Sequence, residues 1–227
     1  MRAPISVVIP TLNAEAGLPA TLVALMEGLP KGLIREVIIS DGGSTDATQR
    51  IAEDAGAVFL SGAPSRGGQL KRGADTAKAE WLLFLHADTV LSTGWTQHIE
   101  PHLKTGQAGY GRLQFAEGGI AGQFVSRWAN LRSGLFGLPY GDQSLLLPAS
   151  LYRQVGGFED IPLMEDVAMA RALKGRLRAL NYTALTSADR YKRDGWLKRR
   201  RKNLWLLTRY LTGAQPEKLA AAYRRSS

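Results

Sequence analysis

Short runs of apolar and β-branched residues recur through the first 90 positions, with more polar segments between them. They lie at residues 5–9, 36–40, 57–60 and 81–85. Runs of this length are typical of strands that are buried on both faces of a parallel sheet. Helix-like segments separate them, so the order is β-α-β-α-β-α-β. We therefore predict an α/β protein in which helices cover both faces of a mostly parallel central sheet.

The pattern changes beyond residue 90. Further elements are expected as helices at 94–103 and 121–135, strands at 109–115 and 141–148, and a helix opening near Pro162. Phe124, Trp128 and Leu131 recur at helical spacing within the second of these helices. We interpret these three side chains as packing residues, because a helix of a globular domain normally buries its apolar stripe.

Carboxylates follow two of the predicted strands. Asp41 comes after residues 36–40, and Asp88 comes after residues 81–85. Ligands of open α/β sheets bind beyond the carboxyl ends of the strands. Asp88 is therefore placed to hold a divalent cation against a phosphate. The alternative is that Asp88 caps the following helix, since Asp is a preferred N-cap residue.

The loop after the first strand offers more polar groups at the same edge. Thr11 and Asn13 either cap the next helix or face a ligand there. After the second strand, Gly43 allows a close backbone approach just before a helix N-terminus, which favours a phosphate or a ribose hydroxyl. Arg66 and Lys71 add positive charge that suits a diphosphate, although they also fit the start of a surface helix.

Glu165 and Asp166 stand side by side in an apolar segment. Leu163, Met164 and Val167 surround them in the sequence. Burial of this kind raises the pKa of a carboxyl group and suits a general base. The alternative is an electrostatic role at a helix N-terminus.

The composition restricts the cellular compartment of the protein and the kinds of metal site that it can contain. The chain has 227 residues, 44% hydrophobic, and no cysteine, which excludes disulfides and cysteine-based metal sites. No apolar run approaches the roughly 20 residues that span a bilayer. Met1 leads into a strand-like segment without a signal-peptide core. We expect a cytoplasmic protein.

The net charge of +9 is concentrated at one end. Residues 171–227 carry 16 basic and 3 acidic residues, whereas residues 1–170 carry 13 and 17. Within the tail, Leu197, Leu204 and Leu211 recur at heptad spacing among lysines, arginines and tryptophans. This composition fits an amphipathic helix on an anionic membrane surface. It equally fits a helix docked on the domain or on a second subunit, or a solvated basic face.

Several of these segments, taken together, resemble the family 2 glycosyltransferases over about residues 5–175. The resemblance rests on residues 8–15, 41–46 and 85–89, then on Gly157-Phe158 and Glu165-Asp166. It implies a GT-A fold, with a nucleotide-binding half at about 1–90 and an acceptor half at about 91–190. The tail at 191–227 lies outside that domain. The His-Ala-Asp-Thr form at 86–89 looks like a short bacterial subgroup with an unassigned acceptor.

The resemblance also implies an activity. It predicts transfer of a sugar, with inversion, from a nucleoside diphosphate sugar of the UDP or GDP type to an acceptor hydroxyl. Asp88 would bind Mg²⁺ or Mn²⁺, and Asp166 would deprotonate the acceptor. The expected site residues are Pro10, Thr11, Asn13, Glu15, Asp41, Gly43, Arg66, Lys71, Ala87 and Asp88 for the donor, Asp142 and Gln143 for the acceptor, Glu165 and Asp166 for catalysis, and Asp88 and His86 for the metal.

The chain departs from the family pattern at one important position. His86 stands where the family commonly has the first aspartate of Asp-x-Asp. The Gln-x-x-Arg-Trp signature of processive members is absent as well, so we expect a single transfer. Two rival functions are a nucleotidyltransferase, which usually has a basic Gly-rich loop after the first strand, and a non-catalytic membrane- or polyanion-binding module. We expect no nucleic-acid partner, and the sequence leaves the oligomeric state open.

Overall fold

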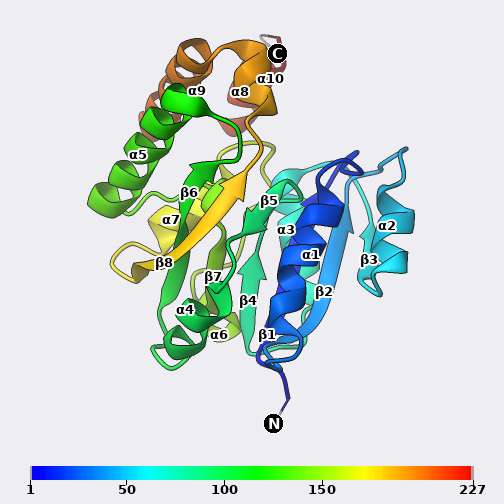
Figure 1. Cartoon of the computed structure of the whole chain (residues 1–227). Helices are drawn as coiled ribbons and strands as arrows, with labels where there is room; N and C mark the ends of the chain where they lie inside the picture. The colour runs from blue at the N-terminus through cyan, green and yellow to red at the C-terminus, as the bar shows by residue number, and fades with distance from the viewer. Residues whose placement is uncertain (1, 226–227) are drawn as a thin grey trace.

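The computed structural model describes residues 2–225, which form one eight-stranded sheet with helices on both faces (Figure 1). The strand order is β3-β2-β1-β4-β7-β6-β8-β5. The elements are β1 (Ile5–Thr11), α1 (Leu18–Leu25), η1 (Met26–Gly28), β2 (Ile34–Asp41), α2 (Thr48–Asp54), β3 (Val58–Ser61), α3 (Arg66–Thr76), β4 (Trp81–Phe84), β5 (Thr89–Leu91), α4 (Trp95–His102), β6 (Ala108–Phe115), α5 (Gly119–Phe136), η2 (Gly141–Gln143), β7 (Leu145–Pro148), α6 (Ala149–Gln154), α7 (Glu165–Ala172), β8 (Leu177–Thr186), α8 (Asp189–Asp194), α9 (Trp196–Leu211) and α10 (Pro216–Arg225). The predicted α/β class is confirmed.

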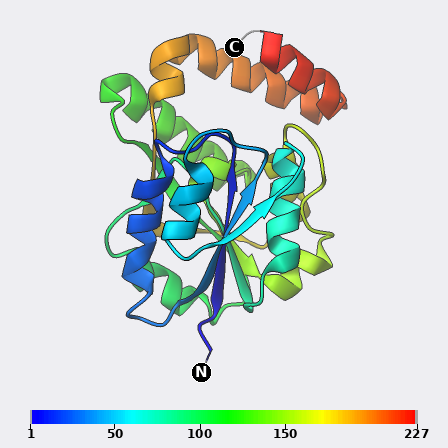
Figure 2. The same cartoon turned by 90° about the vertical axis from the view of Figure 1, so that its right-hand side faces the viewer.

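The four apolar runs of the first 90 residues form the parallel strands β1 to β4. Alternate residues of these strands enter cores on opposite faces of the sheet. Leu83 packs with the core that includes α1 and α4, whereas Leu82 and Phe84 pack with the core that includes α3 and α6. Figure 2 shows the sheet nearly edge-on with α1 and α3 on either side of it. Burial on both faces explains why β1, β2 and β4 read as continuous apolar runs. β3 lies at the edge of the sheet and is only partly buried, with Val58 38% exposed.

The order in which strands are added to the sheet reverses at β1. From β1 the chain moves outward through β2 to β3, then returns to β4 on the other side of β1. In an open α/β sheet, such a reversal separates the crossover connections and leaves a crevice at the carboxyl ends of the two strands. The loops after β1 and β4 therefore meet there.

The second half of the sheet is mixed. β7 runs antiparallel to β4, and β6 runs parallel to β8. The strand expected at residues 141–148 begins only at Leu145, because residues Gly141–Gln143 form the short 3₁₀ helix η2. Asp142 accordingly lies on a turn that enters the strand, not on the strand itself.

One packing interpretation is wrong. Phe124, Trp128 and Leu131 on α5 are exposed rather than packed. The helix contacts the domain through its opposite face, where small residues such as Gly122 and Ala129 are buried. Helical periodicity identified a common face, but the small residues allowed the other face to approach the domain closely.

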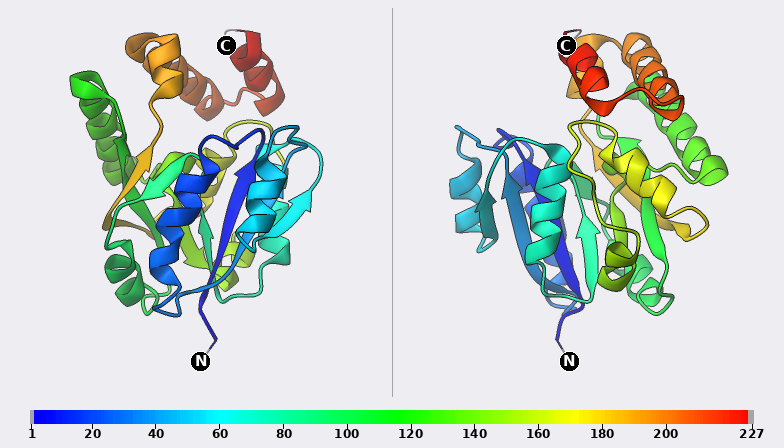
Figure 3. Two further views of the ribbon diagram at one scale, coloured as in Figure 1. Left: turned by 45° about the vertical axis from the view of Figure 1, so that its right-hand side comes forward. Right: turned by 180° about the vertical axis from the view of Figure 1, so that it is seen from behind.

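The basic tail folds over one end of the domain. Helices α9 and α10 lie across the end opposite the N-terminus (Figure 3). Leu206 and Leu207 of α9 and Leu219 of α10 pack against Met164 and Val167. The tail therefore docks on the domain, as one of the alternatives predicted. Of the apolar positions on α9, Leu207 takes part in this docking, whereas the heptad leucines Leu197, Leu204 and Leu211 remain exposed. Ser226 and Ser227 of the predicted tail lie outside the described residues.

Within residues 2–225, no helix combines the length and the apolarity that crossing a bilayer would require.

Candidate active site

A cavity of about 760 Å³ opens where the strand order reverses. Its walls come from the end of β1, the loop after β4, η2, the start of α7 and the tail helices. It collects most of the residues singled out in the sequence: Pro10, Thr11, Asn13, Arg66, His86, Ala87, Asp88, Asp142, Glu165 and Asp166. Asp88 and Asp166, 78 positions apart in the chain, therefore share one cavity.

Five of the expected site residues do not line this cavity. They are Glu15, Asp41, Gly43, Lys71 and Gln143. Lys71 is exposed on α3. Gln143 is fully buried, and its amide donates to Gly111 O at 3.2 Å and accepts from Ser133 Oγ at 2.6 Å. Gln143 therefore lies behind the cavity wall, and it is not placed to bind the acceptor substrate as we expected.

Asp41 organises the turn at the end of β2. Its register partner in the sheet is Thr11, whose hydroxyl donates to Asp41 Oδ1 at 2.8 Å. Ser44 Oγ donates to the same oxygen at 2.5 Å, and the amides of Gly43 and Ser44 both donate to Oδ2 at 2.7 Å. Burial on its own would raise the pKa of Asp41, but these hydrogen bonds outweigh it and lower the pKa. Asp41 is therefore held as a carboxylate.

The loop after β1 is tied to the start of α2. Asn13 has a positive φ of 50°. Its backbone N–H donates to Ser44 Oγ at 2.7 Å, and its side-chain Oδ1 accepts from the backbone N–H of Thr45 at 2.9 Å. Glu15 Oε2 accepts from the amide of Ala47 at 3.0 Å. Asn13 and Glu15 thus bind the turn before a neighbouring helix instead of capping their own, and this fixes the loop's shape.

Gln69 is a supporting residue of this region that was not predicted. It is 5% exposed, and its amide nitrogen donates to Thr11 O at 2.7 Å and to Ser40 O at 2.9 Å. These bonds join the carboxyl ends of β1 and β2. This role could not be predicted from residue type and spacing, because a glutamine on a helix is ordinarily solvated.

Asp88 lies in a tightly packed loop after β4. A Cβ on Gly17 would come 2.9 Å from Ala87 O and 3.1 Å from Asp88 Cα, so only glycine allows this approach of the chain before α1. Thr21 Oγ1 donates to Ala87 O at 2.9 Å. The N-cap of the helix that follows is Gly94, so Asp88 does not serve as its cap.

An arginine links the His-Ala-Asp segment to α7. The Arg66 guanidinium lies 2.6 Å from His86 Nε2, and Arg66 Nε lies 3.3 Å from Glu165 Oε1. Burial raises the pKa of Glu165 to about 7; the neighbouring charge of Asp166 adds to this, and Arg66 opposes it. Glu165 is only 3% exposed, whereas the side chain of its partner Arg66 is 38% exposed.

Asp166 is held by two backbone amides. Gly141 N donates to its Oδ2 at 2.9 Å, and Val167 N donates to its Oδ1 at 2.7 Å. The preceding Met164 has a φ of 71°, a conformation that costs a side-chain-bearing residue about 1–3 kcal/mol. Among residues 2–225, the non-glycine positions with positive φ are Asn13, Ser144 and Met164. All three lie on or next to the cavity wall, so backbone strain is concentrated at the site.

Asp142 has a carboxylate oxygen, Oδ1, that is buried and lacks a hydrogen-bond partner among the described residues. Burial raises its pKa to about 6; Arg132 opposes the rise, and the charges of Asp166 and Asp88 add to it. Asp142 therefore experiences the negative charge of both Asp166 and Asp88.

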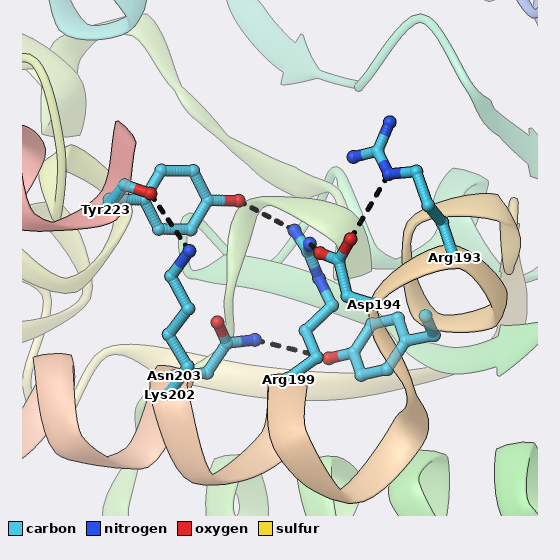
Figure 4. A network of polar contacts seen from close by, with 7 residues as sticks. Arg193, Asp194, Arg199, Lys202, Asn203 and Tyr223 are labelled. Atoms are coloured by element: carbon cyan, nitrogen blue, oxygen red, sulfur yellow. Dashed lines mark hydrogen bonds and ion pairs between the residues drawn. The ribbon is translucent and has the colours of Figure 1, made fainter. Parts of the chain in front are cut away.

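Aromatic and basic side chains from the tail close the cavity. Arg199 is buried and paired with Asp194, and it donates to Tyr223 Oη at 2.6 Å (Figure 4). Asn203 donates to Tyr191 Oη at 3.3 Å. Tyr191, Arg199, Asn203 and Tyr223 all line the cavity. These tail residues were not predicted as part of the site, because nothing in their spacing shows that the tail folds back.

The residues around Asp88 fit a metal ion that arrives with a diphosphate. In the described part of the chain, no three His, Cys, Asp or Glu side chains are gathered as a ready-made metal site. Mg²⁺ commonly uses one or two carboxylates together with substrate phosphates. Asp88 and the under-coordinated Asp142 match that need, whereas His86 is engaged with Arg66.

Comparison with known proteins identifies the family. The family model described as glycosyl transferase family 2 matches residues 6–131. This chain belongs to glycosyl transferase family 2. Its relatives include the PGL/p-HBAD biosynthesis glycosyltransferases of Mycobacterium bovis and Mycobacterium tuberculosis, 39% identical over 40% of this chain. The matched part spans only 38% of those relatives.

Solved glycosyltransferase structures show the same GT-A fold. Glucosyl-3-phosphoglycerate synthase of Mycobacterium tuberculosis, crystallised with Mn²⁺, UDP and glucosyl-3-phosphoglycerate, superimposes with a TM-score of 0.59 and 22% identity over 80% of this chain and 70% of that one. TarS of S. aureus gives a TM-score of 0.61 and 17% identity over 83% of this chain and 62% of that one. The predicted GT-A fold of this chain is confirmed.

Proposed function

We propose that this protein transfers a sugar from a nucleoside diphosphate sugar to an acceptor hydroxyl, once per encounter and with inversion. The observation that carries the proposal is that Asp88 and Asp166 line one cavity at the reversal of the strand order. Asp88 stands beside the loop after β1, and Asp166 stands at the start of α7. Asp88 is thus available to the diphosphate whose bond to the sugar breaks, and Asp166 is available to the hydroxyl that forms the new bond.

The donor belongs at the loops after β1, β2 and β4. The loop at Thr11 and Asn13 is preformed by its hydrogen bonds to the turn at Asp41, so little ordering is needed when a nucleoside binds. Asp88 would hold Mg²⁺ or Mn²⁺ on the diphosphate, and the metal would neutralise charge on the leaving group. Arg66 adds a cation on the same wall.

Asp166 is positioned to take the proton of the acceptor hydroxyl. Its two hydrogen bonds from backbone amides fix the carboxylate and leave further lone pairs for an incoming O–H. The alkoxide-like oxygen then attacks the anomeric carbon as the bond to the diphosphate breaks, so the configuration inverts without a covalent intermediate. Asp142 and the cavity-lining tyrosines are available to bind the acceptor. Glu165 fixes Arg66 and acts through it.

Several finer points of the function belong to the proposal as well. The UDP or GDP type of the donor, the choice between Mg²⁺ and Mn²⁺, the cytoplasmic location and the boundary of the catalytic domain near residue 190 rest on the sequence patterns. The structural neighbour that was crystallised with UDP and Mn²⁺ supports a donor and a metal of these classes.

The test is a donor screen followed by product analysis. The full chain is heated with UDP- and GDP-sugars, with and without Mn²⁺, and a true donor raises the melting temperature only when the metal is present. That donor is then incubated with candidate acceptors, and nuclear magnetic resonance gives the anomeric configuration of the product. Release of nucleoside diphosphate with an inverted product is expected. Pyrophosphate release from a nucleoside triphosphate and a sugar phosphate, or no response to any nucleotide sugar, would refute the proposal.

A further inference from the structure

Helix α5 presents large apolar side chains to solvent. Ile120, Phe124, Trp128, Leu131 and Leu135 are separated by three or four residues and lie on one helical face. Their exposed fractions range from 41% at Trp128 to 88% at Ile120. The face that contacts the domain carries small residues instead. This distribution is the reverse of what an ordinary surface helix shows.

Helix α9 has a second exposed stripe. Leu197, Leu204 and Leu211 follow at heptad spacing, with Trp205 beside them, and all four are exposed. The docking face of this helix is already used, since Leu206 and Leu207 pack against the domain. The exposed leucines are therefore additional to what holds the tail in place.

The two stripes adjoin. Helices α5 and α9 are neighbours at one end of the molecule (Figures 1 and 3). The Arg200 guanidinium lies 5.0 Å from the ring centroid of Phe124 and 5.1 Å from that of Trp128. Arg200 is also three residues after Leu197 and four before Leu204, positions that neighbour each other on a helix. We call the combined area the α5–α9 surface, made of Ile120, Phe124, Trp128, Leu131, Leu135, Leu197, Leu204, Trp205 and Leu211.

The two helices of this surface carry charges of one sign, and the nearby Glu117 is already paired with Lys192. Neither residues 119–136 nor residues 196–211 contain an aspartate or a glutamate. Arg127, Lys198, Arg201 and Arg209 are exposed beside the apolar positions. A two-fold contact between copies would place these cations against one another without a compensating carboxylate. An anionic lipid surface supplies the opposite charge and accepts the apolar side chains.

We propose that the α5–α9 surface docks the protein on an anionic bilayer. The leucines, Phe124 and the two tryptophans enter the headgroup boundary, and the flanking arginines and lysines contact lipid phosphates, as in interfacial amphipathic helices. The inner face of α9 contributes Arg199 and Asn203 to the cavity, so docking places the cavity beside the membrane surface. This proposal does not depend on the chemistry of the cavity.

The test uses the full chain and vesicles of two compositions. Co-sedimentation is measured with phosphatidylcholine alone and with equal parts of phosphatidylcholine and phosphatidylglycerol. Binding to the anionic vesicles is expected, with a blue shift of tryptophan emission and weakening as salt screens the charges. The double variant Phe124→Ser/Trp205→Ser and the double variant Arg201→Glu/Arg209→Glu should each lower the vesicle affinity by about tenfold or more.

The matched control changes exposed apolar residues elsewhere. Val23 and Met26, near the end of α1, are 65% and 59% exposed, and Val23→Ser/Met26→Ser should leave binding unchanged. All variants are checked for an unchanged melting temperature, because the substituted side chains are exposed. Failure of the wild-type chain to bind anionic vesicles at low salt would overturn the proposal, as would equal losses in surface and control variants. A dimer that dissociates in the Phe124→Ser/Trp205→Ser variant, without vesicle binding by the wild type, would assign the surface to a second copy.

Discussion

Asp41, in the turn after β2, and Asp142, in the turn before β7, are both shielded aspartates close to the cavity, yet their surroundings shift their pKa values in opposite directions. Asp41 accepts four hydrogen bonds, which outweigh the effect of burial and lower its pKa. Asp142 keeps a buried oxygen without a partner, and burial together with neighbouring carboxylates raises its pKa to about 6.

The difference separates a scaffold from a reactive region. The loops around Asp41 are complete without a ligand, as expected for a surface that a nucleoside meets ready-made. Asp142 shares the cavity with Asp88 and Asp166, whose negative charges add to the rise in its pKa, and a buried carboxylate with a raised pKa is typical of functional sites. Variants in the two regions should therefore fail in different ways.

The largest effect is expected at Asp166. Asp166→Asn removes the proposed base but keeps the size of the side chain, so the transfer rate should fall by about 10²–10⁴-fold with nearly unchanged donor affinity. Steady-state kinetics and donor titration measure the two quantities separately. Asp54→Asn, at an exposed aspartate on α2, is the matched control and should behave as the wild type. Wild-type turnover in Asp166→Asn would remove this residue from the mechanism.

The scaffold should respond through stability. Asp41→Asn replaces an acceptor with an amide nitrogen that faces the hydroxyls or amides now donating to Asp41. We expect a loss of about 2–3 kcal/mol in the free energy of unfolding, together with weaker donor binding. Urea denaturation measures the stability. A variant that kept full stability but lost catalysis would show that Asp41 belongs to the reactive region, and the comparison would fail.

The sequence predicted the scaffold better than the reactive region, for a physical reason. The apolar runs of β1, β2 and β4 required burial on both faces, and parallel strands bring their carboxyl ends to one edge. This was enough to predict that Asp41 and Asp88 belong to loops at the same edge of the sheet. The short β5 and the strand β8 were not anticipated, because they depend on pairing with each other across almost a hundred residues.

Side-chain direction was harder to predict than position. Lys71 and Gln143 are near the expected site in sequence, but the helical phase of α3 and the η2 turn direct them away from the cavity. On α5, periodicity gave the apolar face correctly and could not show that this face is exposed. Arg199 and Tyr223 lie at the cavity on helices that pack on Met164 and Val167, and Tyr191 lies there through its ring contacts with Phe115 and Trp196.

Glu165 should make the stability of the metal-free protein depend on pH. Its pKa is raised from 4.5 to about 7, so between these values the folded state binds more protons than the unfolded state. The free energy of unfolding should then fall as the pH rises through this range, by about 2 kcal/mol. Glu165→Gln should flatten this part of the profile, which is measured by urea denaturation in the presence of a chelator. An unchanged slope in the variant would mean that another group titrates.

The smallest effect on the free energy of unfolding is expected at Asp142, and its sign is opposite to that of the effect at Asp41. The pKa of Asp142 rises from 3.8 to about 6, so its ionised form destabilises the folded state above that pH. Asp142→Asn is uncharged and similar in shape, and should raise the free energy of unfolding by about 1–2 kcal/mol at pH 8 without metal, after discounting for solvent screening. At pH 4, where most of the wild-type carboxyl is already protonated in the folded state, the two proteins should be nearly equal. The same Asp→Asn change would thus stabilise one turn and destabilise the other. A loss of stability at pH 8 would mean that Asp142 has a partner that holds its charge, and the contrast between the two regions would not hold.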